Sequence, residues 1–219
     1  YRYFEPATQF ECVEYKGKKI ALTVCEDIWN IGNDNPLYTI CPMDELMPQQ
    51  PDFMINLSAS PFAYDHAAER LRIIRANADR YKMPIFYINQ AGAQTEVLFD
   101  GGSVVMSANG AVVDEMRYFQ EDFKVYDLEA IRDAKKSFEQ PKDKITLIHD
   151  ALVMGIRDYF GKLGLKTAVL GLSGGIDSAV VAVLAARALG QDKVRMVLLP
   201  SQFSSDHSVN DARKLAQNL

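Results

Sequence analysis

The sequence predicts an α/β protein, and two patterns lead to this prediction. Ile20, Leu22 and Val24 lie at every second position on one face of residues 18–24, which is the pattern of a β-strand. Residues 167–199 run strand, glycine-rich loop, helix, strand, which is how a doubly wound parallel sheet begins. We therefore expect a mixed sheet covered by helices, followed by the start of a parallel sheet.

Similar patterns assign the other elements. Asn109 and Gly110 form the dipeptide of a tight hairpin turn. Ser208 with Asp211 suits a capping box at the start of the last helix. Further strands are expected at residues 52–57, 83–89, 97–99, 103–107, 111–116, 167–172 and 194–199, and helices at residues 67–81, 145–163, 179–189 and from about 208 onward.

The chain divides near its middle. Residues 131–144 are polar and contain Pro141, which is typical of a linker. We therefore predict one domain at residues 1–130 and a second at residues 145–219. The first residue is Tyr1 instead of Met, so we expect the native start to lie upstream.

Composition indicates a globular protein and argues against several classes of partner. Hydrophobic residues make up 48% and charged residues 24% of the 219 residues. No apolar run approaches the roughly 18 residues that a membrane-spanning helix needs. The net charge of −5, with no basic stripe, does not indicate a nucleic-acid partner. Cys12, Cys25 and Cys41 cannot all pair and show no CxxC spacing, so a cytoplasmic location is expected.

A glycine-rich loop in the second part has the composition of a phosphate-binding loop. Its residues are Gly171, Leu172, Ser173, Gly174, Gly175, Ile176, Asp177 and Ser178. Glycines allow the backbone to approach an anion closely, hydroxyls add donors, and the following helix directs its positive end to the same place. The lysine of a Walker loop is absent, so this is a different kind of ATP site.

Asp177 stands out because it is an acid inside a loop suited to anions. Its carboxylate would repel phosphates unless a cation lay between them. We therefore predict that Asp177 is a ligand of Mg²⁺, which commonly joins one or two protein carboxylates to the phosphates of a nucleotide.

The Ser-Gly-Gly-Ile-Asp-Ser run resembles the pyrophosphate-binding motif of the N-type ATP pyrophosphatases. Enzymes of this group cleave ATP between its α and β phosphates and form an adenylate. Residues 151–159 and 199–205, together with residues 211–216, are similar to stretches of NAD synthetase domains. The resemblance favours an NAD synthetase over a GMP synthetase or a tRNA-modifying pyrophosphatase.

The first part contains a cysteine in a different setting. A cysteine at a strand end is usually a small buried hydrophobe, and we interpret Cys12 and Cys41 in this way. The run from Val24 to Trp29 instead resembles the nucleophile turn of the nitrilase superfamily, in the Cys-Glu-Asp-x-Trp form of glutamine-dependent NAD synthetases. This resemblance implies that Cys25 attacks the carboxamide of glutamine and that the backbone N–H of Glu26 contributes to the oxyanion hole.

Two partners of that cysteine are not found in the sequence. The family uses a Glu–Lys–Cys triad in which the glutamate and lysine precede the cysteine by many tens of residues. Only 24 residues precede Cys25, and Lys16, Lys18 and Lys19 lie on or beside its own strand. We therefore expect the catalytic glutamate and lysine to lie upstream of the chain.

A second motif points to glutamine binding. Residues 56–60 resemble the Asn-Leu-Ser-Ala-Ser segment whose last serine, with a basic residue six positions later, holds the amino-acid end of glutamine. Ser60 fits this pattern, but the later position is His66 instead of Lys or Arg. Arg70 is an alternative for the same contact. Residues 100–103 resemble a further family motif, which we interpret as a structural turn.

The resemblance covers nearly the whole chain. It implies that residues 1–130 are the C-terminal part of a nitrilase-like αββα sandwich and that residues 145–219 begin an ATP-pyrophosphatase domain. The implied reaction converts deamido-NAD, ATP, L-glutamine and water into NAD, AMP, pyrophosphate and glutamate, and members of the family form homo-oligomers. Two alternatives stay open: another nitrilase-domain amidotransferase with an adenylating domain, and a non-catalytic scaffold fragment.

Overall fold

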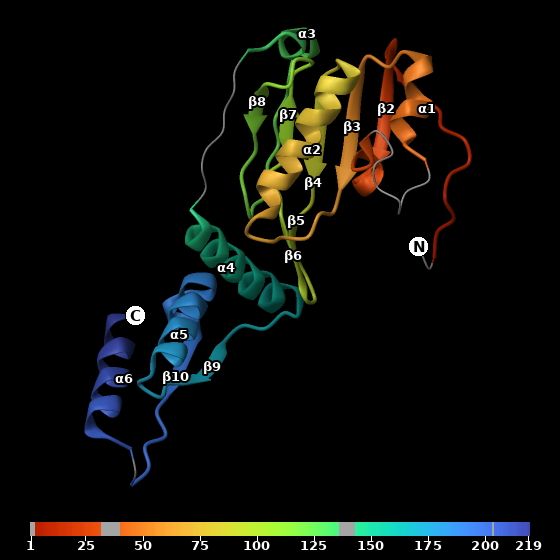
Figure 1. Cartoon of the computed structure of the whole chain (residues 1–219). Coiled ribbons are helices and arrows are strands. Elements are labelled where there is room, and N and C mark those ends of the chain that lie inside the picture. Colours follow the sequence, from red (N-terminus) through yellow and green to blue (C-terminus); the bar gives the residue numbers. More distant parts are fainter. Residues whose placement is uncertain (1–2, 32–39, 136–142, 203) are drawn as a thin grey trace. The chain divides into compact units, whose positions relative to one another are not determined.

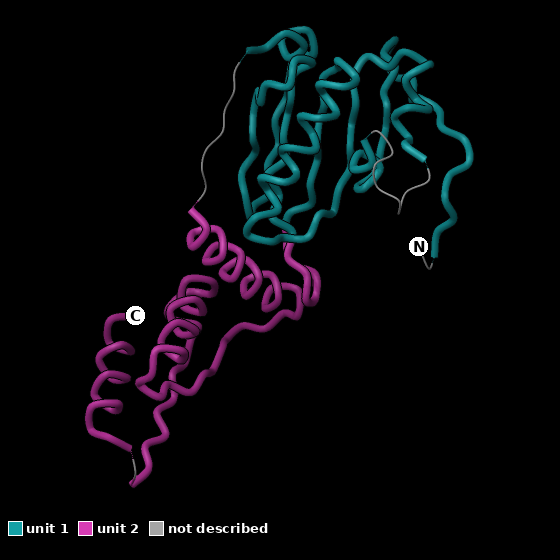
Figure 2. Tube along the Cα trace, viewed as in Figure 1, with its two compact units in different colours: residues 1–91, 99–142 teal, residues 92–98, 143–219 magenta. Residues whose placement is uncertain are grey.

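The computed structural model describes residues 3–31, 40–135, 143–202 and 204–219. The chain folds into two compact units (Figure 2). Unit 1 comprises residues 1–91 and 99–142, and unit 2 comprises residues 92–98 and 143–219.

Unit 1 is built on a mixed sheet. Its six strands lie in the order β1-β2-β3-β4-β7-β8. The strands β2, β3 and β4 are mutually parallel, whereas β1, β7 and β8 pair antiparallel with their neighbours. The bounds are β1 (Val13–Tyr15), β2 (Lys18–Val24), β3 (Phe53–Ser58), β4 (Ile85–Asn89), β7 (Val104–Met106) and β8 (Val112–Glu115). The short helix α1 (Pro42–Leu46) and the 3-10 helices η1 (Cys25–Ile28) and η3 (Met47–Gln49) lie between β2 and β3, and the short helix α3 (Leu128–Arg132) follows β8.

The core of unit 1 lies between one face of this sheet and helix α2 (His66–Tyr81), as Figure 1 shows. Ala21, Met54 and Ile85 occupy paired positions on β2, β3 and β4, and all three are fully buried. Ile74 and Ala78 of α2 belong to the same cluster. Their spacing of four residues places both side chains on one face of the helix.

The apolar alternation in β2 does not identify the covered face. Leu22 and Val24 are 42% and 58% exposed, whereas Ala21 and Thr23 between them are buried. The prediction of a strand is confirmed, but the residues that pack under α2 are the smaller ones, because a helix can approach a sheet closely over small side chains.

Unit 2 contains a parallel pair of strands, β9 (Ala168–Gly171) and β10 (Val194–Val197). Helix α5 (Ile176–Leu189) and the 3-10 helix η4 (Gln191–Lys193) connect them, and helices α4 (Lys144–Lys162) and α6 (Asp206–Asn218) complete the unit (Figure 1). Leu172, Ala182 and Ala212 form its small buried cluster. The α/β prediction, with a mixed sheet followed by a parallel pair, is confirmed.

The hairpin of β5 (Ala91–Gln94) and β6 (Val97–Asp100) contributes its tip, residues 92–98, to unit 2. There the Ala93 N–H donates to Asp158 Oδ2 on α4 over 2.7 Å. The strand expected at residues 97–99 is β6, whereas β5 was not predicted from the sequence. The predicted linker at residues 131–144 stays a prediction, because residues 136–142 lie outside the described residues.

Several boundaries differ from the expectations. The last helix is capped by Ser205, whose Oγ accepts from Ser208 N at 3.2 Å, so the predicted cap at Ser208 is wrong. Ser205 is the N-cap because it directly precedes the first helical turn and has the extended backbone that an N-cap requires. The short strand β1 and helices α1 and α3 were missed. No helix among the described residues is long and apolar enough to cross a membrane.

Candidate functional site

Cys25 lies at a sharp turn directly after β2. It is the first residue of η1, it is partly buried, and its φ angle is +49°. A residue with a side chain is strained in this left-handed region, and such strain often marks a functional turn. The turn therefore has the geometry of a nucleophile presented at a strand end.

Buried polar side chains form hydrogen bonds with this turn and with the strand before it. Asn56, which is fully buried on β3, donates its Nδ2 to the carbonyl oxygen of Cys25 at 3.3 Å and to Thr23 Oγ1 at 3.0 Å. Ser58 Oγ in turn donates to Asn56 Oδ1 at 2.6 Å. Asn56 therefore anchors the turn, a role that the motif in residues 56–60 did not reveal from the sequence.

The electrostatics around the Cys25 sulfur oppose ionisation. Burial raises the pKa of the thiol, and the negative charge of Glu26 raises it further. Hydrogen bonds from the backbone N–H groups of Ala59 and Glu26 act in the opposite direction. The backbone N–H groups of Ala59 and Glu26 are therefore the neighbours that favour the Cys25 thiolate.

The three residues expected to bind glutamine have different surroundings. Ser60 is buried, and its N–H donates to Asn89 Oδ1 at 3.0 Å. His66 is the first residue of α2, is partly exposed, and places Nδ1 3.1 Å from Pro61 O. Ser60 and His66 therefore flank the loop that follows β3.

Arg70 is turned away from such a contact. Its Nη1 and Nη2 donate to the two carboxylate oxygens of Asp100 at 2.8 and 2.6 Å. The guanidinium is buried within this pair, which leaves it little access to a glutamine carboxylate. Asp100 belongs to the motif interpreted as a turn, and the sequence held no local signal of this pairing because the two residues are 30 positions apart.

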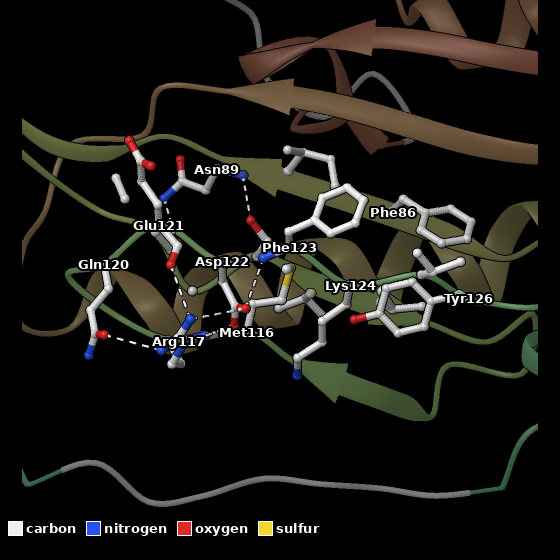
Figure 3. A pocket seen from close by; sticks show the side chains of 18 residues that line it. Phe86, Asn89, Met116, Arg117, Gln120, Glu121, Asp122, Phe123, Lys124 and Tyr126 are labelled. Atoms are coloured by element: carbon white, nitrogen blue, oxygen red, sulfur yellow. Dashed lines mark hydrogen bonds and ion pairs between the residues drawn. The ribbon is translucent and has the colours of Figure 1, made fainter.

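A cavity of about 700 Å³ in unit 1 lies beside β4 and β7 and the segment that follows β8 (Figure 3). Phe86, Met116, Phe123 and Tyr126 contribute much of its lining, and Arg117 bonds to neighbours at its rim. None of Cys25, Ser60, His66 or Arg70 lines it. The cavity is therefore separate from the candidate nucleophile.

The glycine-rich loop of unit 2 connects β9 to α5. Gly174 has a φ angle of +84°, and a Cβ added there would lie 2.1 Å from the carbonyl oxygen of Ser208. Ser173 and Ser178 bond to each other through their hydroxyls at 3.0 Å, and Gly175 N donates to Ser173 Oγ at 3.2 Å. Only glycine fits at position 174, which explains its place in the motif.

This loop faces the later motif across a cavity of about 560 Å³. Ser204, Ser205 and Ser208 line the cavity together with Ser173 and Gly171, so the glycine-rich loop and the stretch that begins at residue 199 meet there. The cavity opens at the carboxyl ends of β9 and β10, where ligands bind in open parallel sheets. Phe203 of the later motif lies outside the described residues.

Asp177 is exposed in the first turn of α5. The described residues contain no group of three or more His, Cys, Asp or Glu able to hold a metal by themselves. One exposed carboxylate beside a phosphate-type loop instead suits a magnesium ion whose other ligands are phosphate oxygens and water.

Comparisons with known proteins show what the chain is similar to. The family described as NAD synthase matches residues 148–219. Glutamine-dependent NAD(+) synthetases from Synechocystis and Thermotoga maritima are 40% and 31% identical, and each alignment covers 100% of this chain. The chain is homologous to the glutamine-dependent NAD(+) synthetases. It spans 40% of the length of the Synechocystis relative and 42% of the Thermotoga relative.

A solved structure agrees with this homology. The glutamine-dependent NAD+ synthetase from Acinetobacter baumannii, in complex with ADP, is 31% identical with a TM-score of 0.84. The match covers 99% of this chain and 40% of that one. The predicted α/β fold agrees with this likeness.

Proposed function

We propose that the chain is the central part of a glutamine-hydrolysing NAD synthetase. The enzyme would convert deamido-NAD, ATP, L-glutamine and water into NAD, AMP, pyrophosphate and glutamate. One observation supports this most strongly: a strained cysteine turn and a glycine-rich phosphate loop occur in one chain whose full length aligns with synthetases of that name.

In the glutaminase half-reaction, the Cys25 thiolate attacks the carboxamide carbon, ammonia leaves, and water hydrolyses the resulting thioester. The backbone N–H of Glu26 stabilises the oxyanion, and Ser60 and His66 bind the amino-acid end of glutamine. Because burial and Glu26 raise the thiol pKa, the nucleophile needs a cation and a base. The lysine and glutamate expected upstream would supply them.

In the synthetase half-reaction, residues 171–178 bind ATP through backbone N–H groups and the hydroxyls of Ser173 and Ser178. Asp177 would hold Mg²⁺, and the bound ion would supply positive charge against the phosphates of ATP, whose AMP part is transferred to the nicotinate carboxylate. Ammonia then displaces AMP. Protecting ammonia inside the protein is useful because in water near neutral pH it is mostly protonated and a poor nucleophile.

The proposal also covers the protein's assembly state, its substrates and its location in the cell. We propose a cytoplasmic homo-oligomer that acts on small molecules. The full-length similarity to glutamine-dependent NAD synthetases favours this assignment over another nitrilase-domain amidotransferase. A non-catalytic scaffold would not require a cysteine held in a strained conformation above buried polar groups.

The test is Cys25→Ala in the full-length protein. NAD formation from glutamine should fall by at least about a thousandfold, because amide hydrolysis needs the thiolate, whereas formation from ammonium salts should continue. Cys12→Ala is the matched control, since Cys12 is also a free, partly buried cysteine. Equal loss with both nitrogen sources in Cys25→Ala would refute the assignment, as would full activity with glutamine.

A further inference from the structure

We propose that Arg70, Asp100 and Asn89 form a positioning relay that holds the loop residues Ala59 and Ser60 against the Cys25 nucleophile. This inference rests on the proposed glutaminase function and assigns to Arg70 a role different from substrate binding. The relay links helix α2 to the loop after β3 through side chains that are distant in sequence.

The relay begins with an ion pair in the interior of unit 1. The side chains of Arg70 and Asp100 are 4% and 1% exposed, and two nearly parallel hydrogen bonds join them. Burial acts to lower the pKa of Arg70, but the hydrogen bond and charge of Asp100 raise it overall. The guanidinium therefore stays charged, and its bidentate fork defines the orientation of the carboxylate.

Asn89, at the end of β4, transmits that orientation. Its Nδ2 donates to Asp100 Oδ1 at 3.0 Å and to Gly101 O at 2.9 Å. Since both amide protons are engaged, Oδ1 must face the other way, where it accepts from Ser60 N at 3.0 Å. The ion pair thus specifies the rotamer of Asn89, and Asn89 specifies the position of the Ser60 backbone.

Further contacts hold the same loop. Pro61 pairs with Phe99, the neighbour of Asp100, in an antiparallel β-bridge. Tyr87 is buried beneath the loop, and burial raises the pKa of its hydroxyl while hydrogen bonds to Ser58 and Ser60 lower it. Tyr87 and Tyr118 are the titratable groups that interact electrostatically with Arg70 besides Asp100.

The segment that carries Ala59 and Ser60 is joined to the Cys25 turn by side-chain hydrogen bonds. Ser58 Oγ, next to Ala59, donates to Asn56 Oδ1 at 2.6 Å, and Asn56 Nδ2 donates to Cys25 O at 3.3 Å. The backbone N–H of Ala59, next to Ser60, lowers the pKa of the Cys25 thiol. Moving Ser60 by a few tenths of an ångström would displace this donor. A site of this kind tolerates little displacement, because a preorganised donor acts only from the correct distance.

A buried ion pair is weak evidence for stability alone, because an apolar pair of the same volume is often at least as stable. A purely structural pair would therefore affect folding without affecting the thiol. The positioning role predicts a change in the thiol itself, and the two roles can be separated by experiment.

The experiment compares Arg70→Lys and Asn89→Ala with Arg80→Lys in the full-length protein. Arg80 is the control because it lies on the same helix and pairs with an aspartate, Asp44, at the surface. Arg70→Lys keeps the charge but loses the fork, and Asn89→Ala removes the acceptor of Ser60 N–H. NAD formation is measured with glutamine and with ammonium, and iodoacetamide labelling of the Cys25 peptide is followed by mass spectrometry as a function of pH.

We expect kcat with glutamine to fall about tenfold in Arg70→Lys and more in Asn89→Ala, with ammonium-driven synthesis unchanged. The pH midpoint of Cys25 labelling should rise in both, because the Ala59 N–H no longer supports the thiolate. Arg80→Lys should match the parent protein in every measurement.

Unchanged labelling midpoints and glutamine kinetics in both variants would overturn the relay. Loss of folding in both, or equal loss with both nitrogen sources, would show that the pair is only structural and would also overturn it. Failure of the proposed function looks different: the parent protein would then form no NAD from glutamine, or Cys25→Ala would retain that activity.

Discussion

The turn at Cys25 and the loop at residues 171–178 both follow the end of a β-strand, yet they are supported in opposite ways. The Cys25 turn lies above fully buried polar side chains, Asn56 and Thr23, that bond to its backbone or to each other. In the glycine-rich loop, by contrast, Asp177 is exposed, and Ser173 and Ser178 bond to each other and to their own loop.

The difference follows from what each segment must do. A strained nucleophile persists only where the surroundings over-determine its conformation, so its turn needs a core behind it. A phosphate loop acts through backbone N–H groups that must stay open to the ligand, so its shape comes from glycines and local hydroxyls. Changes at the two sites should therefore differ in which reaction they abolish and in how they affect folding.

Gly174→Ala should have the largest effect. The added methyl group would lie 2.1 Å from Ser208 O and would strain a φ angle of +84°. We expect NAD formation to fall more than about a hundredfold with either nitrogen source, since the phosphate loop cannot keep its shape. Gly164→Ala is the control, because Gly164 has a φ angle of +69° with nothing within 4 Å. Equal effects of the two changes would mean that backbone strain, not the close contact, is responsible.

Asp177→Ala should come next. Without its carboxylate, the magnesium ion loses its proposed protein ligand, and adenylation should slow by about a hundredfold with glutamine or ammonium. Asp192→Ala, which removes an exposed acid near the other end of α5, should leave the rate unchanged. Release of AMP and pyrophosphate by the parent protein is measured in parallel, and products of ADP and orthophosphate would contradict the proposed chemistry.

Asn56→Ala tests the support of the nucleophile turn. The change leaves the Cys25 carbonyl and the Thr23 hydroxyl without their donor, at a cost of about 1–3 kcal/mol in the free energy of unfolding. Glutamine-driven synthesis should fall about tenfold, with ammonium-driven synthesis retained. Ser107→Ala is the control, because Ser107 is equally buried but its hydroxyl bonds to Ala111, away from the Cys25 turn. A similar loss of stability without the loss of glutaminase activity is expected there, as measured by urea unfolding.

His66→Ala should have the smallest effect. If His66 binds the amino-acid end of glutamine, the KM for glutamine should rise several-fold while kcat changes little, as happens when uniform binding is lost. His207→Ala, which alters an exposed histidine of α6, should change neither constant. An unchanged KM in His66→Ala would remove His66 from the glutamine site.

Much of this molecule follows from local sequence. The glycine-rich loop between a strand and a helix was predicted because its turn and anion chemistry depend on neighbours within eight residues. The strand before Cys25 and helix α2 were predicted from periodicity for the same reason. The predicted roles of Cys25, Ser60 and Asp177 are supported by resemblance and remain for experiment to decide.

Other features depend on groups that only folding brings together. Arg70 was a candidate for substrate binding, but it meets Asp100 from 30 residues away and is taken up in an ion pair. In the sequence, Asn56 is one residue of the motif at residues 56–60. Its hydrogen bond to the Cys25 carbonyl forms because the fold places β3 beside the Cys25 turn. Side-chain partners separated by tens of residues leave no local pattern, because their contact depends on strand pairing and helix packing, whereas turns and helices depend on the few residues that form them.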